Sequence, residues 1–311
     1  MANDYRIPRC QALPIAGHQV QFLIDGQERL RWNFDPSYPR PFFYPLIGPG
    51  GVSLTRMGHP GAPNHDHHQS VWFAHHKVLG IDFWGNTGDA RIRQQEWLAY
   101  VDGDAEAVMA VRLGWFDGHD PRALLTQDVV AAVRPGPERE TFLEIQTTLT
   151  PTADELELGK TNFGLLAVRV AKSLSAYFGG GQIVDSEGRA GEPAIFGQQA
   201  RWMDYSGPAT PDTTEGITFF DHPANPGHPC HWHVREDGWM GASLCFAEPR
   251  LLQKLQPLTL RYLLHLHRSG ADQARSATVF AEFAASAAFL VERSSTRHLM
   301  HSVRRQQAAT P

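Results

Sequence analysis

Histidines concentrate in two short stretches of the sequence. The first stretch, residues 59–76, reads HPGAPNHDHHQSVWFAHH and holds six of the chain's 16 histidines. The second stretch, residues 221–233, reads DHPANPGHPCHWH and holds four more. Imidazole is a common metal ligand and the side chain that most readily changes its charge near neutral pH. The two stretches therefore predict a site for metal binding or for acid–base chemistry.

Spacing indicates which histidines act together. On an extended backbone, alternate residues share a face. Three pairs have this spacing: His65 and His67, His231 and His233, and His265 and His267. A metal site needs three or four ligands, so the first two pairs define one hypothesis, a divalent metal in an oxygenase or hydrolase. The sequence contains no HExxH motif, and hydrogen bonding that orders long loops is the alternative role for these histidines.

A second hypothesis assigns the histidines to proton transfer on a sugar. Residues 185–192 (DSEGRAGE) are predicted to form a polar loop, and Glu187 in it would face His65, His67 or His68. Such a pair moves protons at an anomeric or α-carbonyl carbon. Other residues have side chains that hold substrate oxygens or stack on a sugar ring, and they are predicted to bind the substrate: Lys160, Arg235, Trp72, Asp221, His222 and His233. For each of these residues taken singly, surface solvation or core packing is the competing interpretation.

Charge, hydropathy and cysteine content limit which binding partners and which cellular compartment are expected. The net charge of −5 offers no electrostatic attraction for nucleic acid or for an anionic membrane. The sequence has no run of about 18 apolar residues, so no membrane-spanning segment is expected. Three cysteines without a CxxC pair favour a reducing cytoplasm. The expected partner is a small, sugar-like molecule, and the sequence makes no prediction about oligomers.

Strand-length segments dominate the pattern. Between residues 94 and 150, runs such as VMAVRLGWF and ETFLEIQTTLTP alternate with Asp, Gly and Pro clusters, which is typical of a large antiparallel sheet. Residues 271–292 are alanine-rich with helical spacing. Residues 294–311 are polar and are predicted to fray. Residues 1–311 therefore predict a single, mainly β domain with a short C-terminal helix.

Several longer motifs resemble the PmoA-like family of bacterial proteins. They occur in order between about residues 40 and 270 and include PFFYPLIGPGGVSLTR, GKTNFGLLAVRVA and GITFFDHPANPGHPCHWHVR. The resemblance implies a β-sandwich and relatives in sugar-catabolic settings. It also links His65, His67 and His68 to the second histidine stretch. The sequence departs from the family pattern at Asn64 and Asp66, where Asp and Pro are usual.

Together these observations predict one large antiparallel β-sandwich, of the supersandwich kind found in galactose mutarotases. The site is expected where residues 59–76, 185–192 and 221–233 converge. The favoured function is a carbohydrate-active enzyme that epimerises, eliminates or hydrolyses a sugar or keto-sugar. The alternatives are the metal-dependent enzyme and a sugar-binding protein without catalysis. This assignment rests on residue types and on analogy with a fold.

Overall fold

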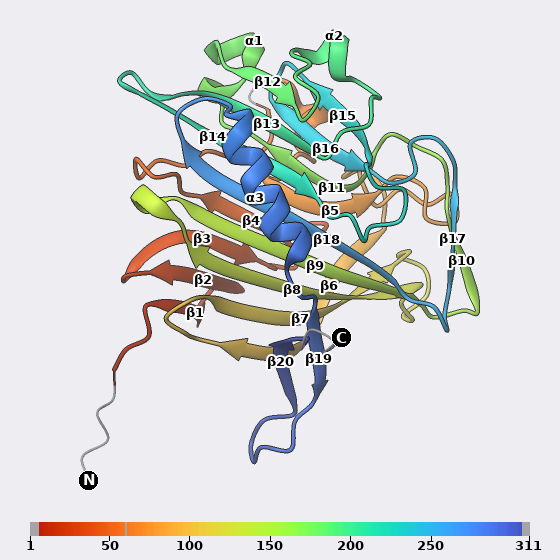
Figure 1. The fold of residues 1–311 in the computed structure, drawn as a ribbon. Coiled ribbons are helices and arrows are strands. Elements are labelled where there is room, and N and C mark those ends of the chain that lie inside the picture. Colours follow the sequence, from red (N-terminus) through yellow and green to blue (C-terminus); the bar gives the residue numbers. More distant parts are fainter. Residues whose placement is uncertain (1–5, 60, 307–311) are drawn as a thin grey trace.

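Two large antiparallel sheets make up most of the molecule. The structure is a computed structural model that describes residues 6–59 and 61–306. Within these residues each large sheet has eight strands (Figure 1). In spatial order the first sheet contains β1 (Cys10–Ile15), β2 (Gln19–Ile24), β3 (Gln27–Asn33), β4 (Phe42–Leu46), β5 (Val71–His75), β11 (Gly164–Arg169), β16 (Trp239–Ser243) and β15 (His231–Arg235). The second contains β12 (Gln182–Asp185), β13 (Trp202–Thr210), β14 (Thr213–Asp221), β18 (Leu258–Arg268), β9 (Thr141–Pro151), β8 (Leu125–Pro135), β7 (Ala107–Phe116) and β6 (Arg91–Val101).

The remaining elements are two short strand pairs, three helices and three 3-10 turns among the described residues. Two further strand pairs are β10 (Glu155–Leu158) with β17 (Arg250–Gln253), and β19 (Phe289–Arg293) with β20 (His301–Arg305). The helices are α1 (Ala176–Gly179), α2 (Glu192–Ile195) and α3 (Gln273–Ala285), with 3-10 turns η1 (Pro63–His65), η2 (Pro137–Arg139) and η3 (Lys172–Leu174). In Figure 1, α1 and α2 lie together at one end of the molecule.

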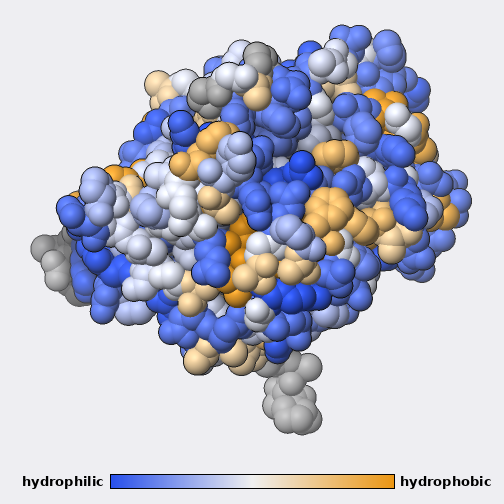
Figure 2. All heavy atoms as spheres, turned by 90° about the horizontal axis from the view of Figure 1, so that it is seen from above, coloured by the Kyte–Doolittle hydropathy of each residue, from blue (hydrophilic) through white to orange (hydrophobic). Residues whose placement is uncertain are grey.

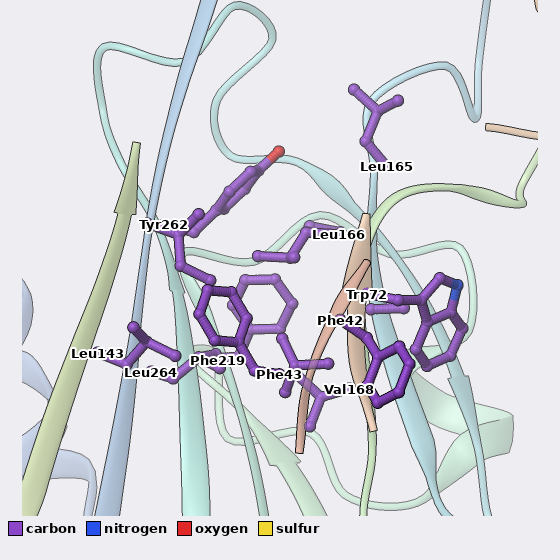
Figure 3. Close-up of a cluster of buried hydrophobic side chains, with 14 of the residues drawn as sticks. Phe42, Phe43, Trp72, Leu143, Leu165, Leu166, Val168, Phe219, Tyr262 and Leu264 are labelled. Atoms are coloured by element: carbon purple, nitrogen blue, oxygen red, sulfur yellow. The ribbon is translucent and has the colours of Figure 1, made fainter. Parts of the chain in front are cut away.

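The main core lies between the two sheets. On β2 every second residue is buried, namely Val20, Phe22 and Ile24, because alternate side chains of a strand point to opposite faces. Figure 3 shows Phe43, Leu166 and Val168 of the first sheet facing side chains of the second. Those partners are Leu143, Phe219, Tyr262 and Leu264. The face-to-face packing makes the fold a β-sandwich.

The helix α3 covers the outer face of the second sheet (Figure 1). Asp272 caps it by accepting a hydrogen bond from the Arg275 amide. Val279 and Phe283 pack in a separate cluster with Leu263 of β18. The outward residues of β18 are buried under this helix, so the strand is buried on both faces.

The observed fold confirms the predicted mainly β, antiparallel sandwich with a short C-terminal helix. The helix is shorter than the predicted span, because Phe289–Arg293 pairs as β19 with β20. That pairing also places His301–Arg305, part of the segment predicted to fray, in a strand; residues 307–311 lie outside the described residues. Among the described residues, the helices are too short or too polar to cross a membrane.

Candidate functional site

A row of side chains on the outer face of the first sheet provides the base of the site. Residues at paired positions of neighbouring strands point to the same face. The row crosses β5, β11, β16 and β15 and consists of Trp72, Ala167, Gly241 and His233. A side chain at position 241 would come within 3.0 Å of the Trp239 ring. Gly241 therefore allows the Trp239 indole to lie against the sheet, 4.1 Å from the His233 ring centroid.

A pocket of about 440 Å³ opens beside this row. Its size is within the range of small-molecule sites. Three loops and the sheet surround it: the histidine loop (residues 59–69), the loop at residues 76–86, and residues 162–163 before β11. From above, the end of the molecule that carries α1 and α2 is mostly hydrophilic, with separate small hydrophobic patches (Figure 2).

The histidine loop curls, so that three of its imidazoles meet. The amide of His65 donates to the Ala62 carbonyl, and the amide of His68 donates to the His65 carbonyl. The ring centroids of His67 and His68 are 4.3 Å apart, and those of His65 and His68 are 5.3 Å apart. All three histidines line the pocket. An extended backbone would have turned His68 away from the other two.

Arg40 fixes the histidine loop to the neighbouring loop. Its guanidinium is 1% exposed and donates hydrogen bonds to the carbonyl oxygens of His67, Trp84 and Gly85. A guanidinium has five donors in a rigid fork, so one side chain can hold two loops at once. Burial lowers the Arg40 pKa to about 9. The pattern of the sequence did not point to Arg40.

Burial keeps His67, His68 and His233 uncharged at neutral pH. It lowers the pKa of His67 to about 4, and the nearby Arg40 charge acts in the same direction. It lowers the pKa of His233 to about 4 as well. His68 is stacked on Trp72 with ring centroids 5.2 Å apart, and burial places its pKa far below the usual range. An uncharged imidazole is the form that accepts a proton.

His233 is oriented as a base. Its Nδ1 is 3.0 Å from the Asn162 carbonyl oxygen, which can only accept a hydrogen bond. Nδ1 therefore carries the proton, and Nε2 has a free lone pair. Nε2 has no hydrogen-bond partner among the described residues, and His233 lines the pocket while only 3% of it is exposed. The pocket is where this nitrogen can meet a ligand.

A histidine and a carboxylate complete the polar wall. His76 Nε2 lies 3.9 Å from Asp82 Oδ2, and both residues line the pocket. The other oxygen of Asp82 accepts hydrogen bonds from the amides of Trp84 and Gly85. Among the described residues that line the pocket, Asp82 is the only carboxylate. No pattern in the sequence pointed to Asp82, although it is only six positions beyond His76.

Aromatic rings form the remaining walls. Trp84 lies 5.8 Å from Trp239 and 5.9 Å from Phe163, measured between ring centroids. Phe196, at the end of α2, meets His233 edge-on at 4.9 Å. These apolar rings line the same pocket as the histidines and Asp82. Such a lining suits a ring-shaped ligand with apolar faces and polar edges.

The structure places several predicted site residues outside the pocket. Glu187 is about half exposed and pairs with Arg201 at 3.6 Å, so it does not face the histidine loop as predicted. Lys160 is exposed and does not line the pocket. Trp72 lies behind His68, so it supports that ring. Arg235 does reach the rim, where it pairs with Glu192 at 2.9 Å.

Most of the polar residues in the second histidine stretch make structural contacts away from the pocket. Only His233 of this stretch reaches the pocket. Asp221 is buried and binds His228 and the Cys230 amide. His222 accepts a hydrogen bond from Arg261 next to α3. The predicted convergence of residues 221–233 with the histidine loop is thus limited to one residue, because β14 and β15 belong to different sheets.

The four histidines of the metal hypothesis do not come together. His231 stacks on Phe246 at 5.2 Å, its Nδ1 bonds to the Gly197 carbonyl, and it does not line the pocket. Within residues 6–59 and 61–306, no three His, Cys, Asp or Glu side chains are arranged to hold a metal ion. The donor sets present therefore do not fit the divalent metal site suggested by the spacing.

Comparisons with known proteins identify a family and one similar structure. Residues 19–281 match the model of a family of unknown function, DUF6807. This match overturns the resemblance to the PmoA-like family, which finds no support. A search of curated proteins finds no match. The solved structure of YeaD from Salmonella typhimurium, titled a "putative mutarotase", is 11% identical; the alignment covers 84% of this chain and 97% of that chain, with a TM-score of 0.34.

Proposed function

The chain belongs to the DUF6807 family, whose function is unknown, and from its pocket we propose an enzyme that transfers protons on a sugar or keto-sugar. One observation carries this proposal: uncharged imidazoles, one carboxylate and several aromatic rings line a single pocket. The apolar face of a sugar ring stacks on aromatic side chains, and its hydroxyl groups bond to polar ones. The site offers both kinds of contact.

Proton transfer is the reaction that these side chains support best. His233 Nε2 accepts a proton from the hydroxyl group or the carbon next to the carbonyl of the bound sugar. The His76–Asp82 pair lines the same pocket and returns a proton to the substrate. Mutarotation takes a proton from the anomeric hydroxyl and gives one to the ring oxygen as the ring C–O bond breaks. Epimerisation takes a proton from one face of the carbon next to the carbonyl and returns one to the other face. His67, held neutral by burial and by Arg40, is a second proton acceptor that lines the same pocket.

Glycoside hydrolysis is less compatible with this pocket. Most glycosidases use two carboxyl groups on opposite sides of the bond that breaks. Asp82 is the only carboxylate among the described lining residues, and Glu187 lies outside the pocket. We therefore favour epimerisation or elimination over hydrolysis.

Nuclear magnetic resonance in deuterated water tests the proposal. The protein is mixed with a panel of aldoses, ketoses and keto-glycosides, and the rates of anomer interconversion and of C–H to C–D exchange are measured. We expect one class of sugar to show catalysed exchange, and His233→Gln to slow it by about 10²- to 10⁴-fold, the usual contribution of a general base. His231→Gln, on the same strand but outside the pocket, is the matched control. Saturable binding without exchange would instead identify a sugar-binding protein.

A further inference from the structure

A second cavity lies beside the same two loops, and the proposed function does not use it. Its volume is about 500 Å³. Asp66 and Gln69 line it from the histidine loop, and Asn86 lines it from the loop that follows Trp84. Because Asp66 and Asn86 are next to His67 and Gly85 in the sequence, the two cavities share the loops that separate them.

Arg40 orients two amide groups toward this cavity. Its Nη1 donates to Gln69 Oε1 at 3.1 Å, and its Nη2 donates to Asn86 Oδ1 at 3.2 Å. A guanidinium has only donors, so the amide oxygens must turn toward it and the NH₂ groups must turn away. Neither NH₂ group has a hydrogen-bond partner among the described residues.

Gln69 is the stronger indication of a ligand. It is only 2% exposed, and it lines the cavity. Buried polar groups are almost always hydrogen-bonded. The NH₂ group of Gln69 has a fixed direction and no partner in the described part of the chain, so it is a donor available to a ligand in the cavity.

The cavity is also lined by one positively charged and one negatively charged side chain, Arg91 and Asp66. Arg91 uses Nη1 for the carbonyl oxygens of Gly88 and Ala90, and its other N–H groups have no partner among the described residues. The Asp66 carboxylate likewise forms no hydrogen bond within the described chain. One cation and one anion, with amide donors between them, suit a neutral ligand that both accepts and donates hydrogen bonds. Tyr38, 39% exposed, adds an aromatic surface.

We propose that this second cavity is a binding site for a neutral polyhydroxylated ring, that is, a saccharide unit. Its oxygen atoms accept hydrogen bonds from Gln69, Asn86 and Arg91, and one of its hydroxyl groups donates to Asp66. The proposal does not depend on the reaction in the first pocket, since it rests on donors and acceptors that the first pocket does not contain.

Calorimetric titration with a panel of neutral mono- and disaccharides tests the site. We expect a saccharide to bind the wild-type protein, and Asp66→Ala and Asn86→Ala each to weaken that binding about tenfold, the effect of one hydrogen bond to a ligand. Both side chains are exposed, so these variants are expected to fold. Asp89→Ala, an exposed carboxylate in the neighbouring loop outside the cavity, is the control.

The same titration is repeated in the His233→Gln background, in which the first pocket lacks its proposed base. Binding that still depends on Asp66 and Asn86 supports the second site whether or not the protein catalyses proton exchange. If no saccharide in the panel shows binding that depends on Asp66 or Asn86, in either background, the proposal is overturned. Proton exchange is measured separately, so the failure of one proposal is distinguishable from the failure of the other.

Discussion

Two groups of buried histidines in this molecule have opposite surroundings. On β18, His265 Nε2 lies 2.7 Å from Glu140 and His267 Nε2 lies 2.8 Å from Asp204. Arg275 of α3 contacts Glu140 and the other nitrogen of His267. In the pocket, His233 has a backbone carbonyl as its hydrogen-bond partner instead of a carboxylate. Each β18 histidine thus binds a carboxylate, and His267 also contacts Arg275 through its second ring nitrogen. In the pocket, His233 keeps one ring nitrogen without a partner among the described residues.

The difference teaches that the partner of a buried histidine decides its role. For His267, burial opposes the charged form, but the Asp204 carboxylate outweighs burial and the pKa is raised. For His233, burial acts without a carboxylate contact and lowers the pKa to about 4. Both residues belong to an H-x-H pair on a strand. The carboxylate-bound imidazole of His267 thus joins the sheet to α3, whereas the neutral imidazole of His233 is available for proton transfer.

The largest expected effect comes from breaking the charged pair. Asp204→Ala leaves His267 buried without its carboxylate and removes the acceptor of the Thr218 hydroxyl. Removing one partner of a buried ion pair typically costs about 3–5 kcal/mol. We expect a loss of that size in the free energy of unfolding, measured with urea. A loss below about 1 kcal/mol would show that this pair does not support the sheet under α3. His233→Gln, tested in parallel, is expected to affect stability much less at neutral pH.

Stability as a function of pH separates His233 from His267 by the sign of their pKa shifts. The folded-state pKa of His233 is about 4, below the unfolded value of about 6.5. The unfolded chain therefore binds a proton first, and stability is lost as the pH falls from about 6.5 towards 4, by about 3 kcal/mol from this group. His267 has a raised pKa, so its contribution is complete below about pH 6.5 and is lost as the pH rises through its folded-state pKa.

Free energies of unfolding between pH 4 and pH 8 check these signs. His233→Gln is expected to flatten the acid side of the profile, and His267→Gln is expected to flatten the alkaline side. Identical profiles for the two variants would contradict the proposed contrast. The comparison requires only a folded protein and no knowledge of the substrate.

Local patterns in the sequence were sufficient for the fold and for part of the site. Strand-length segments between Asp, Gly and Pro clusters predicted a large antiparallel sheet, and period-two spacing correctly placed His265 and His267 side by side, with ring centroids 5.3 Å apart. The histidine loop could be proposed as part of a site from the sequence, because a high density of one chemically active residue type is visible without any structure. All three of its predicted catalytic histidines line one pocket.

The features of the site that the sequence did not predict depend on contacts between segments that are far apart in the chain. Arg40 is separated by 27 to 46 positions from the groups that it binds, and a single arginine before an aromatic strand has no local signature. The β15 pair was read as two ligands, but different neighbours in the fold separate His231 from His233. Whether a strand residue belongs to the site depends on the loops that cover it, and these are set by the tertiary structure.

The smallest expected effect concerns the carboxylate that residue type alone had favoured. Glu187 is 51% exposed, lies 3.6 Å from Arg201 and does not line the pocket. Exposed ion pairs contribute little, so Glu187→Gln is expected to change the free energy of unfolding by less than about 0.5 kcal/mol. Proton exchange on the sugar is expected to stay within about twofold of wild type.

Asp82→Asn is the matched substitution inside the pocket, and it is expected to slow exchange at least about tenfold, because it removes the carboxylate next to His76. The two variants lose the same charge, so they differ only in where that charge lies. If Glu187→Gln slowed exchange as strongly as Asp82→Asn, the reaction would take place outside the aromatic pocket. The free nitrogen of His233 would then be a feature of packing, and the contrast with β18 would no longer separate chemistry from scaffold.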